Sequence, residues 1–304
     1  AAILVKYEYG LDKNGIGVGK PTIIGIGANH VVPEHDPSAH GEMSCLRDTT
    51  KRLGHSDLRD TVMFTSCECC PQCQAAISSH GVNKVVFANN RDQAAAIQFS
   101  DEEQYRHIAE MDKYMSNVNN LGNKDALIAA LGVHDAVIIN KDGEVLASGN
   151  INLDSSDPLE SLASMNAIRA ACKKTEGFHL PEGCTIVTRN KIHPTAFTTA
   201  DWARIGRVRD PENPNDTSKD KFEKDPTKIV YLNEKFEEVF LKGKDGKPFT
   251  HASAQQVLDD VNTEPNNRNL VKTEAITDTI TLRFAHEAFE QWNRLIGNDE
   301  RLKY

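Results

Sequence analysis

Two short motifs hold the residues with the most distinctive chemistry in this chain of 304 residues. His40 is followed two positions later by Glu42, and further on Cys70 and Cys73 form a Cys-x-x-Cys motif. One histidine and two cysteines can hold a zinc ion while its fourth position stays open to water, as in catalytic zinc sites. Glu42 is then placed to move protons to and from that water. We therefore expect one zinc ion held by His40, Cys70 and Cys73.

The cysteines and the overall charge narrow the class of protein. Four of the seven cysteines lie between residues 67 and 73, which favours a metal site over a secreted disulfide framework. The sequence contains no apolar run of about 18 residues and opens with no signal segment, so we expect a cytoplasmic protein without a membrane partner. The net charge of -9 and the lack of a basic stripe argue against a nucleic-acid partner.

Regular elements must bring the two motifs together. Asp36-Pro37-Ser38 is a helix-start signal, and Pro71 suits the first position of a second helix. The order β-β-α-β-α-β predicts an α/β sheet covered by helices on its faces. Apolar runs bounded by turn residues predict strands at residues 2–7, 22–27, 61–65 and 85–88.

The starts of these two helices are the expected location of the zinc site. Side chains two apart, such as His40 and Glu42, point away from each other on the flank of a regular helix. They can converge only if the cavity lies off the helix start. Cys70 and Cys73 flank the start of the other helix, where the dipole and unpaired N–H groups favour thiolate. We expect two helix N-termini to enclose one ion.

The second part of the chain repeats the first. Residues 136–146 form a hairpin pattern with a Lys-Asp-Gly turn, and an Asp-Pro pair and a helix pattern follow. Three anchor residues match at nearly constant offsets: Met43 with Met165, Thr65 with Thr188, and Pro71 with Pro194. We interpret this as an internal duplication. It divides the chain into a catalytic domain, residues 1–118, and a second domain with a C-terminal tail, residues 119–304.

The second copy has lost the candidate chemistry. Leu162 replaces His40, Ser164 replaces Glu42 and Ala196 replaces Cys73, so that only His193, opposite Cys70, could bind a metal. One ligand does not hold zinc. We therefore expect one zinc ion and one active site per chain. Beyond this copy we expect a polar loop at Asp210–Asp225, amphipathic pieces around Phe236–Phe240 and Ala254–Val261, and a long helix at Thr273–Ile296.

The motifs resemble those of a known family. The first copy resembles the cytidine deaminase superfamily, and within it the guanine deaminase branch. The resemblance rests on Asp-Pro-Ser-Ala-His-Gly-Glu-Met at 36–43, Thr-Ser-Cys-Glu-Cys-Cys-Pro-Gln-Cys at 65–73, the Ala-Ala-Ile-x-Phe-x-Asp run within 91–102, and the tail at 288–304. It implies two tandem three-layer α/β/α domains, each a mixed sheet flanked by helices, with the second one degenerate.

The resemblance also implies an activity and further site residues. The reaction would be zinc-dependent hydrolysis of a purine base, guanine to xanthine and ammonia, with Glu42 as the proton carrier. Asn29 matches an asparagine that binds the base, although it could be a turn residue. Asp101 matches a carboxylate that assists proton transfer, although it could cap a helix. Phe99 could stack on the purine or belong to the core, and Tyr304 at the tail is expected to contact substrate.

Two features depart from the family. Cys69 stands where the motif has proline, which places a spare thiol beside the zinc. Family members are usually dimers of identical subunits in which the partner's C-terminal segment closes the active site, whereas here an inactive copy is fused on. We expect an intrachain pseudo-dimer whose second half and tail act as that partner, and a further homo-oligomer is compatible with it.

Three other functions share parts of this pattern. A tRNA adenosine deaminase would use the same zinc motif, but the acidic charge argues against it. A deaminase of guanosine or cytidine would need room for ribose, which the sequence does not measure. A non-enzymatic zinc-stabilised interaction module has no use for Glu42 and would favour a fourth protein ligand.

Overall fold

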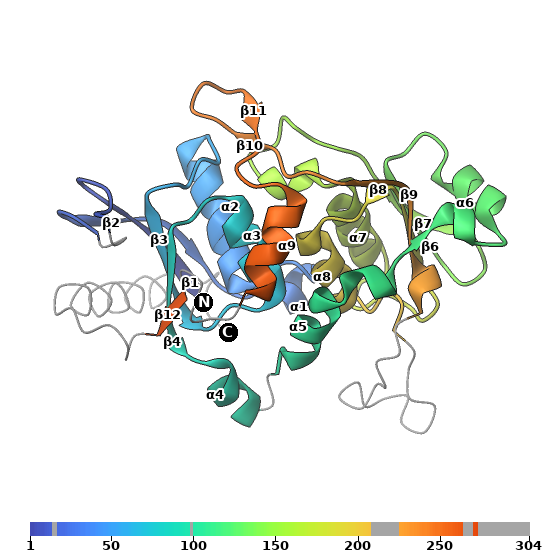
Figure 1. The fold of residues 1–304 in the computed structure, drawn as a ribbon, viewed down its shortest axis with the longest axis horizontal. Coiled ribbons are helices and arrows are strands. Elements are labelled where there is room, and N and C mark those ends of the chain that lie inside the picture. The colour runs from blue at the N-terminus through green and yellow to red at the C-terminus, as the bar shows by residue number, and fades with distance from the viewer. Residues whose placement is uncertain (14–16, 98–99, 208–224, 264–269, 273–304) are drawn as a thin grey trace.

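The computed structural model describes residues 1–13, 17–97, 100–207, 225–263 and 270–272. They form two five-stranded mixed sheets, with most of the helices packed between them (Figure 1). This confirms the mixed α/β architecture with helix-flanked sheets. In the part of the chain that is described, no helix has the length and apolar character needed to cross a membrane.

The first sheet is built mainly by the first half of the chain, residues 1–118. Its strands are β1 (Ala2–Tyr7), β2 (Pro21–Gly27), β3 (Thr61–Cys67), β4 (Lys84–Asn89) and β12 (Leu270–Lys272). Their order is β12-β4-β3-β1-β2. β1 is antiparallel to β2 and β3, while β3 and β12 are parallel to β4. The four strands predicted from apolar runs are therefore confirmed.

The helices of the first half position the motif residues. They are α1 (Val31–Glu34), α2 (Gly41–Leu53), α3 (Pro71–Ser79), α4 (Arg91–Ala96) and α5 (Glu102–Ala109), with 3₁₀ turns at Met111–Tyr114 and Val118–Asn120. Pro71 opens α3, as predicted. The helix expected to start at Asp36-Pro37-Ser38 begins only at Gly41. Asp36 instead accepts hydrogen bonds from the backbone N–H and hydroxyl of Ser38, which favour a turn over a helix.

The second sheet repeats the topology of the first. Its strands are β5 (Ser116–Asn117), β6 (Ala136–Ile139), β7 (Val145–Gly149), β8 (Thr185–Lys191) and β9 (Ile229–Phe236). The order β5-β9-β8-β6-β7 has the same sequence of antiparallel and parallel pairs as the first sheet. Equivalent pairs even share register, with Ala2 opposite Thr65 and Ala136 opposite Thr188.

Each sheet is completed by a strand from the other half of the chain. β5 ends just before residue 118, yet it pairs with β9 in the second sheet. β12 comes from the second half, residues 119–304, yet it pairs with β4 in the first sheet. The two halves are therefore tied together by backbone pairing in both directions.

The remaining helices belong to the second half. They are α6 (Lys124–Leu131), α7 (Ala163–Lys174), α8 (Pro194–Trp202) and α9 (Ala254–Asn262), with 3₁₀ turns at Pro158–Ser161 and Pro226–Lys228 and a small hairpin of β10 (Leu241–Lys242) and β11 (Pro248–Phe249). Ala254, Val257 and Val261 are buried on α9, so the amphipathic pattern there is confirmed. Phe236, by contrast, ends strand β9.

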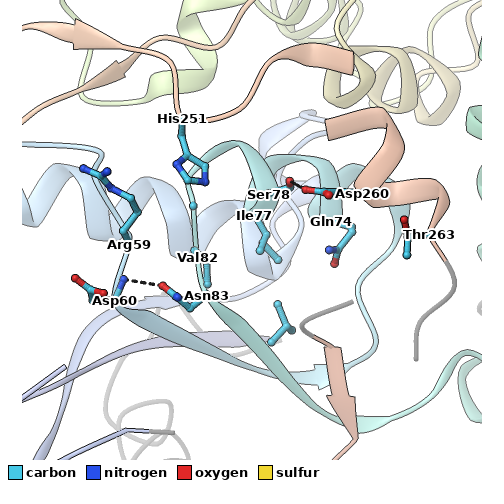
Figure 2. A pocket seen from close by; sticks show the side chains of 12 residues that line it. Arg59, Asp60, Gln74, Ile77, Ser78, Val82, Asn83, His251, Asp260 and Thr263 are labelled. Atoms are coloured by element: carbon cyan, nitrogen blue, oxygen red, sulfur yellow. Dashed lines mark hydrogen bonds between the residues drawn. The ribbon is translucent and has the colours of Figure 1, made fainter. Parts of the chain in front are cut away.

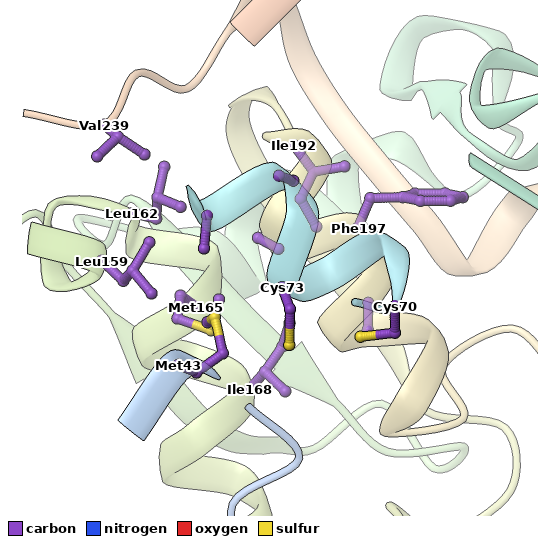
Figure 3. Close-up of a cluster of buried hydrophobic side chains, with 14 of the residues drawn as sticks. Met43, Cys70, Cys73, Leu159, Leu162, Met165, Ile168, Ile192, Phe197 and Val239 are labelled. Carbon is purple, nitrogen blue, oxygen red and sulfur yellow. The ribbon is translucent and has the colours of Figure 1, made fainter. Parts of the chain in front are cut away.

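One hydrophobic core runs through both halves. It contains Met43 and Cys73 from the first half and Met165 and Ile168 from the second (Figure 3). Helices α3 and α8 pack against each other at its centre. The sheets face this shared core with their inner sides, and α6 covers the outer side of the second sheet.

A reciprocal set of ion pairs also joins the halves. Arg47 of α2 binds Asp157 at 2.8 Å, and Arg169 of α7 binds Asp36 at 2.9 Å. Arg169 also lies 3.3 Å from Asp157. A contact in which equivalent residues exchange roles is the pattern of a two-fold dimer interface, here within one chain. It fixes the loop that leads from Asp36 to His40.

Some predicted features lie outside the described residues. They are Phe99, Tyr304, the helix expected at Thr273–Ile296 and residues 210–224 of the expected loop.

Candidate active site

His40, Cys70 and Cys73 come together at the starts of two helices. His40 is the N-cap of α2 and Cys70 is the N-cap of α3, both with extended backbone conformations. Cys73 lies in the first turn of α3. The sequence folds this way because buried β3 leads into α3, where the fixed φ of Pro71 suits the first helical position. Two helix N-termini thus face one point, as expected.

The three side chains fit a zinc ion in type and spacing. Their ligand atoms, one ring nitrogen and two sulfurs, all lie within 4.8 Å of one another. The Nδ1 atom of His40 is 3.3 Å from the Sγ atom of Cys70 and 3.6 Å from that of Cys73. Zn–N and Zn–S bonds of about 2.0 and 2.3 Å at tetrahedral angles place nitrogen and sulfur about 3.5 Å apart. The donor set and its separation therefore suit tetrahedral zinc with one position left over.

The charges of these groups are coupled. Burial opposes ionisation of Cys70, but hydrogen bonding from Cys73 and attraction to His40 lower the pKa of this thiol well below its usual range. Burial and the adjacent Cys70 sulfur raise the pKa of Cys73. Burial disfavours charge on His40 too, yet the neighbouring Cys70 sulfur raises its pKa. Cys70 is thus ready to act as a thiolate ligand, the form that binds metal.

Glu42 lies beside this group, in the first turn of α2. Its side chain is buried, with an exposed fraction of 9%. Its Oε2 atom accepts a hydrogen bond of 3.4 Å from the thiol of Cys73. The carboxylate is therefore held within reach of the point that His40, Cys70 and Cys73 surround, where a general acid or base would act.

Asp101 is a second buried carboxyl near the cluster. It occupies the N-cap position of α5 but makes no capping hydrogen bond, so the capping alternative does not account for its side chain. Its Oδ1 atom has no hydrogen-bond partner among the described residues. Burial and then the charge of Cys70 raise the pKa of Asp101 to about 8. A carboxyl that keeps its proton at neutral pH can donate it.

Asn29 differs in its surroundings. It is exposed, and its Oδ1 atom accepts a hydrogen bond of 3.0 Å from the backbone N–H of Val31 at the start of α1. This is the turn geometry expected of an asparagine at that point. Its side-chain amide N–H groups make none of the hydrogen bonds that the structure records.

Cys69, the residue in place of the motif proline, does not join the ligand group. The cluster of possible metal ligands in the described residues contains His40, Cys70 and Cys73. Cys69 is buried, and burial raises the pKa of its thiol well above the usual range. Its carbonyl accepts a hydrogen bond of 2.5 Å from the hydroxyl of Tyr105 on α5. Its backbone thus connects α5 to the start of α3.

The sequence motifs did not reveal one aromatic neighbour of the cluster. Trp202, at the end of α8 in the second half, lies edge-on against the His40 ring with centroids 5.1 Å apart. No local pattern could have identified it, because its link to His40 depends on how α8 packs against α3.

In the second half, the corresponding helix starts, those of α7 and α8, have different side chains. Leu162 is the N-cap of α7 and His193 the N-cap of α8, matching His40 and Cys70 in position. Ser164 donates its backbone N–H and its hydroxyl to the carboxylate of Glu237, which follows β9. Over the ranges that the structure describes, this half contains no group of three potential metal ligands.

A cavity of about 470 Å³ lies at the opposite end of α3 (Figure 2). Gln74, Ser78 and His251 are among its lining residues, and the Ser78 hydroxyl donates a hydrogen bond to Asp260 of α9. None of the candidate zinc ligands lines it. The cavity is therefore separate from the His40 cluster.

Known proteins match the part of the chain that contains these residues. Residues 15–89 match the family model described as the cytidine and deoxycytidylate deaminase zinc-binding region. The matched residues all lie within the first half. The match includes the ligand cluster and Glu42 and ends before Asp101.

Individual relatives cover the same region. The chain is 38% identical to guanine deaminase from Bacillus subtilis (strain 168) over 86 residues, which are 28% of this chain and 55% of that protein. It is 31% identical to the tRNA-specific adenosine deaminase of Buchnera aphidicola subsp. Schizaphis graminum (strain Sg) over 91 residues, 28% of this chain and 60% of that protein. The chain thus spans little more than half the length of these relatives.

Solved structures also match part of the chain. The structure of guanine deaminase from Bacillus subtilis has 33% identity and a TM-score of 0.30, covering 34% of this chain and 59% of that one. NE0047 in complex with 2,6-diaminopurine has 28% identity and a TM-score of 0.28, covering 33% of this chain and 51% of that one.

Proposed function

We propose that this protein is a zinc-dependent hydrolase that deaminates a purine base, converting guanine and water to xanthine and ammonia. The buried group of His40, Cys70 and Cys73, with the Glu42 carboxylate hydrogen-bonded to Cys73, carries the proposal. A structural zinc site would use a fourth protein ligand and would leave Glu42 without a role. The 38% identity to a guanine deaminase over this region favours guanine.

The chain's own groups can move the protons of this reaction. A zinc ion held by His40, Cys70 and Cys73 would supply the Lewis acidity that activates water at neutral pH. Glu42 would take a proton from the water and deliver it to the ring nitrogen beside the carbon under attack. Asp101, whose pKa burial raises to about 8, would donate a proton to the exocyclic amine as it leaves as ammonia, and would recover one from the hydroxyl that becomes the new carbonyl group. Asn29 would donate from its side-chain amide to the base.

We further propose that the chain arose by duplication and has one zinc ion and one active site. The matching strand orders and the reciprocal ion pairs support this division at about residue 118, although β5 and β12 each pair in the sheet of the other half. The second half then serves in cis as the partner subunit, and the tail helps to close the site with Tyr304. Truncation after Glu290 tests the tail: we expect lost turnover with zinc retained, and full activity would exclude this role.

One alternative has a specific observation in its favour. The identity to a tRNA-specific adenosine deaminase over nearly the same segment leaves a nucleic-acid substrate as the second candidate. The net charge of -9 opposes it, because phosphate backbones are bound by clustered lysine and arginine. A tRNA substrate would make turnover fall steeply with salt, whereas turnover of a free base would be nearly independent of it.

Ammonia release from a panel of substrates tests the function directly. The panel contains guanine, adenine, cytosine, their nucleosides and a tRNA with an adenosine in its anticodon. Each substrate is assayed with the intact chain and with Glu42→Gln. We expect guanine to be turned over and the variant to be inactive with zinc still bound. Turnover of a nucleoside or tRNA alone would replace the substrate assignment. Zinc binding without any turnover would favour the interaction module.

A further inference from the structure

Helix α8 of the second half contacts three parts of the candidate active site. Near its middle, Thr199 accepts a hydrogen bond of 2.5 Å from the side-chain amide of Gln72, which lies between Cys70 and Cys73. Its last two residues, Asp201 and Trp202, extend this contact to α5 and to His40. The degenerate half thus lies directly against the residues that would bind zinc.

Trp202 contacts the His40 ring itself. The two rings meet edge to face, with an interplanar angle of 76° and centroids 5.1 Å apart. His40 is almost fully enclosed, with an exposed fraction of 7%. Because the Nδ1 atom of His40 must face both sulfurs to complete the ligand set, the rotation of this ring decides whether a tetrahedral site forms. The indole restricts that rotation by packing.

Asp201 holds the helix that begins at Asp101. Its Oδ2 atom lies 2.9 Å from the Nδ1 atom of His107 on α5, and its Oδ1 atom accepts a hydrogen bond of 2.8 Å from Arg207. Both Asp201 and His107 are fully buried. A buried carboxylate paired on both oxygens is a rigid anchor, because losing either partner would leave charge uncompensated. The anchor fixes α5, and therefore the start of α5 where Asp101 lies.

We propose that Trp202 and Asp201 are positioning residues of the candidate active site, Trp202 for the ligand His40 and Asp201 for the proton donor Asp101. This proposal rests on the proposed function, and it gives the second half a role in positioning the residues of the active site. Groups that orient metal ligands without touching the metal typically change metal affinity or activity 10- to 100-fold when they are removed. At the repeat offset, the positions of Asp201 and Trp202 correspond to Ser78 and Ser79 of α3. The larger side chains therefore occur on α8, which packs against the candidate active site, and not at the corresponding positions of α3.

Metal affinity tests the role of Trp202. In competition with a chromophoric chelator, Trp202→Ala should weaken zinc binding about 10- to 100-fold and alter the absorption bands of the cobalt-substituted protein. Trp202→Phe keeps an aromatic ring, so its zinc affinity should lie between those of Trp202→Ala and the intact chain. The matched control is Phe178→Leu, which removes an aromatic ring 4.1 Å from a histidine elsewhere in the second half. Unchanged affinity and unchanged cobalt bands in Trp202→Ala would overturn the assignment.

A second measurement does not depend on the stability of that variant. The chain has two tryptophans, so Trp292→Phe leaves Trp202 as the single tryptophan, whose emission can be excited selectively. Cobalt added to this protein should quench most of the emission at one equivalent per chain, because the indole lies against a ligand. Emission unaffected by bound cobalt would place Trp202 away from the metal and overturn the proposal.

The Asp201 anchor is tested through its partner on α5. His107→Gln breaks the link but leaves the Asp201–Arg207 pair in place. We expect kcat to fall about tenfold, while KM and zinc affinity stay within twofold, a split that general destabilisation would not produce. Asp201→Asn should act in the same direction. Asp135→Asn, which alters a partly exposed pair with Arg189, is the control. A kcat within twofold of the intact chain for His107→Gln would exclude the anchor.

The experiments distinguish failure of the proposed function from failure of the positioning role. If the intact chain binds zinc but deaminates nothing, the proposed function fails, while the metal-affinity and fluorescence results still decide on Trp202. If the intact chain deaminates guanine and the variants of Trp202 and His107 match it throughout, the positioning role fails and the function stands.

Discussion

The two halves have the same arrangement of strands and helices, but they differ in the side chains at the corresponding helix starts. In the first half the N-caps of two neighbouring helices are His40 and Cys70, and in the second half they are Leu162 and His193. In both halves the sheet order, the strand directions and the register of the central pair are the same. This arrangement therefore does not by itself specify a metal site. The two halves differ in the side chains at a few positions, and those of the first half could hold a metal ion.

The difference lies in how buried polar groups are satisfied. In the second half Leu162 and Ala196 fill space without polar atoms, and Glu237 is bonded to Ser164. In the first half two thiols, an imidazole and two carboxyls are buried close together, and Asp101 keeps an oxygen without a partner among the described residues. Buried polar groups normally have partners. The first half has an arrangement that is unfavourable unless a cation joins it.

Converting the first site into the second should have the largest effect. His40→Leu and Cys73→Ala introduce the residues of the second half, and each should reduce bound zinc from one per chain to nearly none and abolish turnover, because two ligands do not hold the ion. Metal analysis of purified protein measures this. A chelator should lower the Tm of the intact chain but not of His40→Leu. The control is His193→Asn, and any loss of zinc there would contradict the inactivity of the second site.

The next effect is the removal of the proposed proton carrier. Glu42→Gln should keep zinc but lower kcat by at least about a thousandfold, because general acid–base groups contribute 10²–10⁴ and Glu42 would serve more than one proton transfer. Steady-state kinetics of ammonia release measure it. Glu237→Gln, the buried glutamate of the second half, is the control and should leave kcat unchanged. Equal turnover by Glu42→Gln and the intact chain would remove the enzymatic interpretation.

Asp101 should have a smaller effect. Asp101→Asn keeps the shape but cannot donate a carboxyl proton, so we expect kcat to fall about 10- to 100-fold with zinc content unchanged. The comparison is with Asp112→Asn, whose carboxylate lies 2.6 Å from Lys191 and is largely exposed. If both variants behave alike, Asp101 has only a local structural role.

The buried glutamate of the second half, Glu237, should affect the stability of the chain rather than its activity. Burial raises the pKa of Glu237 from 4.5 to about 7, so between these values the folded chain binds more protons than the unfolded chain, and stability falls as pH rises. At pH 8 Glu237→Gln should therefore be more stable than the intact chain, by roughly 3–4 kcal/mol at 1.4 kcal/mol per pKa unit. Chemical denaturation at pH 5 and pH 8 measures this. Equal pH dependence in both proteins would show that the carboxyl does not titrate there.

Cys69 should have the smallest effect. Its thiol is buried outside the ligand group, and its contact with Tyr105 uses the backbone carbonyl. Cys69→Ala should keep one zinc per chain and a kcat within about twofold. Loss of zinc from this variant would identify Cys69 as a ligand and change the donor set.

Local sequence was sufficient for the elements that position the motifs. Proline at the first position of α3 and an apolar run at β3 have meanings that depend on neighbouring residues, and both were confirmed. The start of α2 was wrong by several residues because the Asp36 side chain bonds to Ser38, which competes with helix formation. The clustering of His40, Cys70 and Cys73 agrees with the prediction from their spacing, and the two cysteines lie next to the helix start that Pro71 marks.

What the sequence determined by itself was the types of the clustered residues, the helix start at Pro71 and the absence of the same set from residues 119–304, because these depend on a few adjacent residues. The tertiary structure alone decided the exchange of β5 and β12, the burial of Asp101, the bond between Ser164 and Glu237 and the contact of Trp202 with His40. Each of these joins residues distant in sequence through the packing of two surfaces, and such packing leaves no periodic or local pattern in the chain.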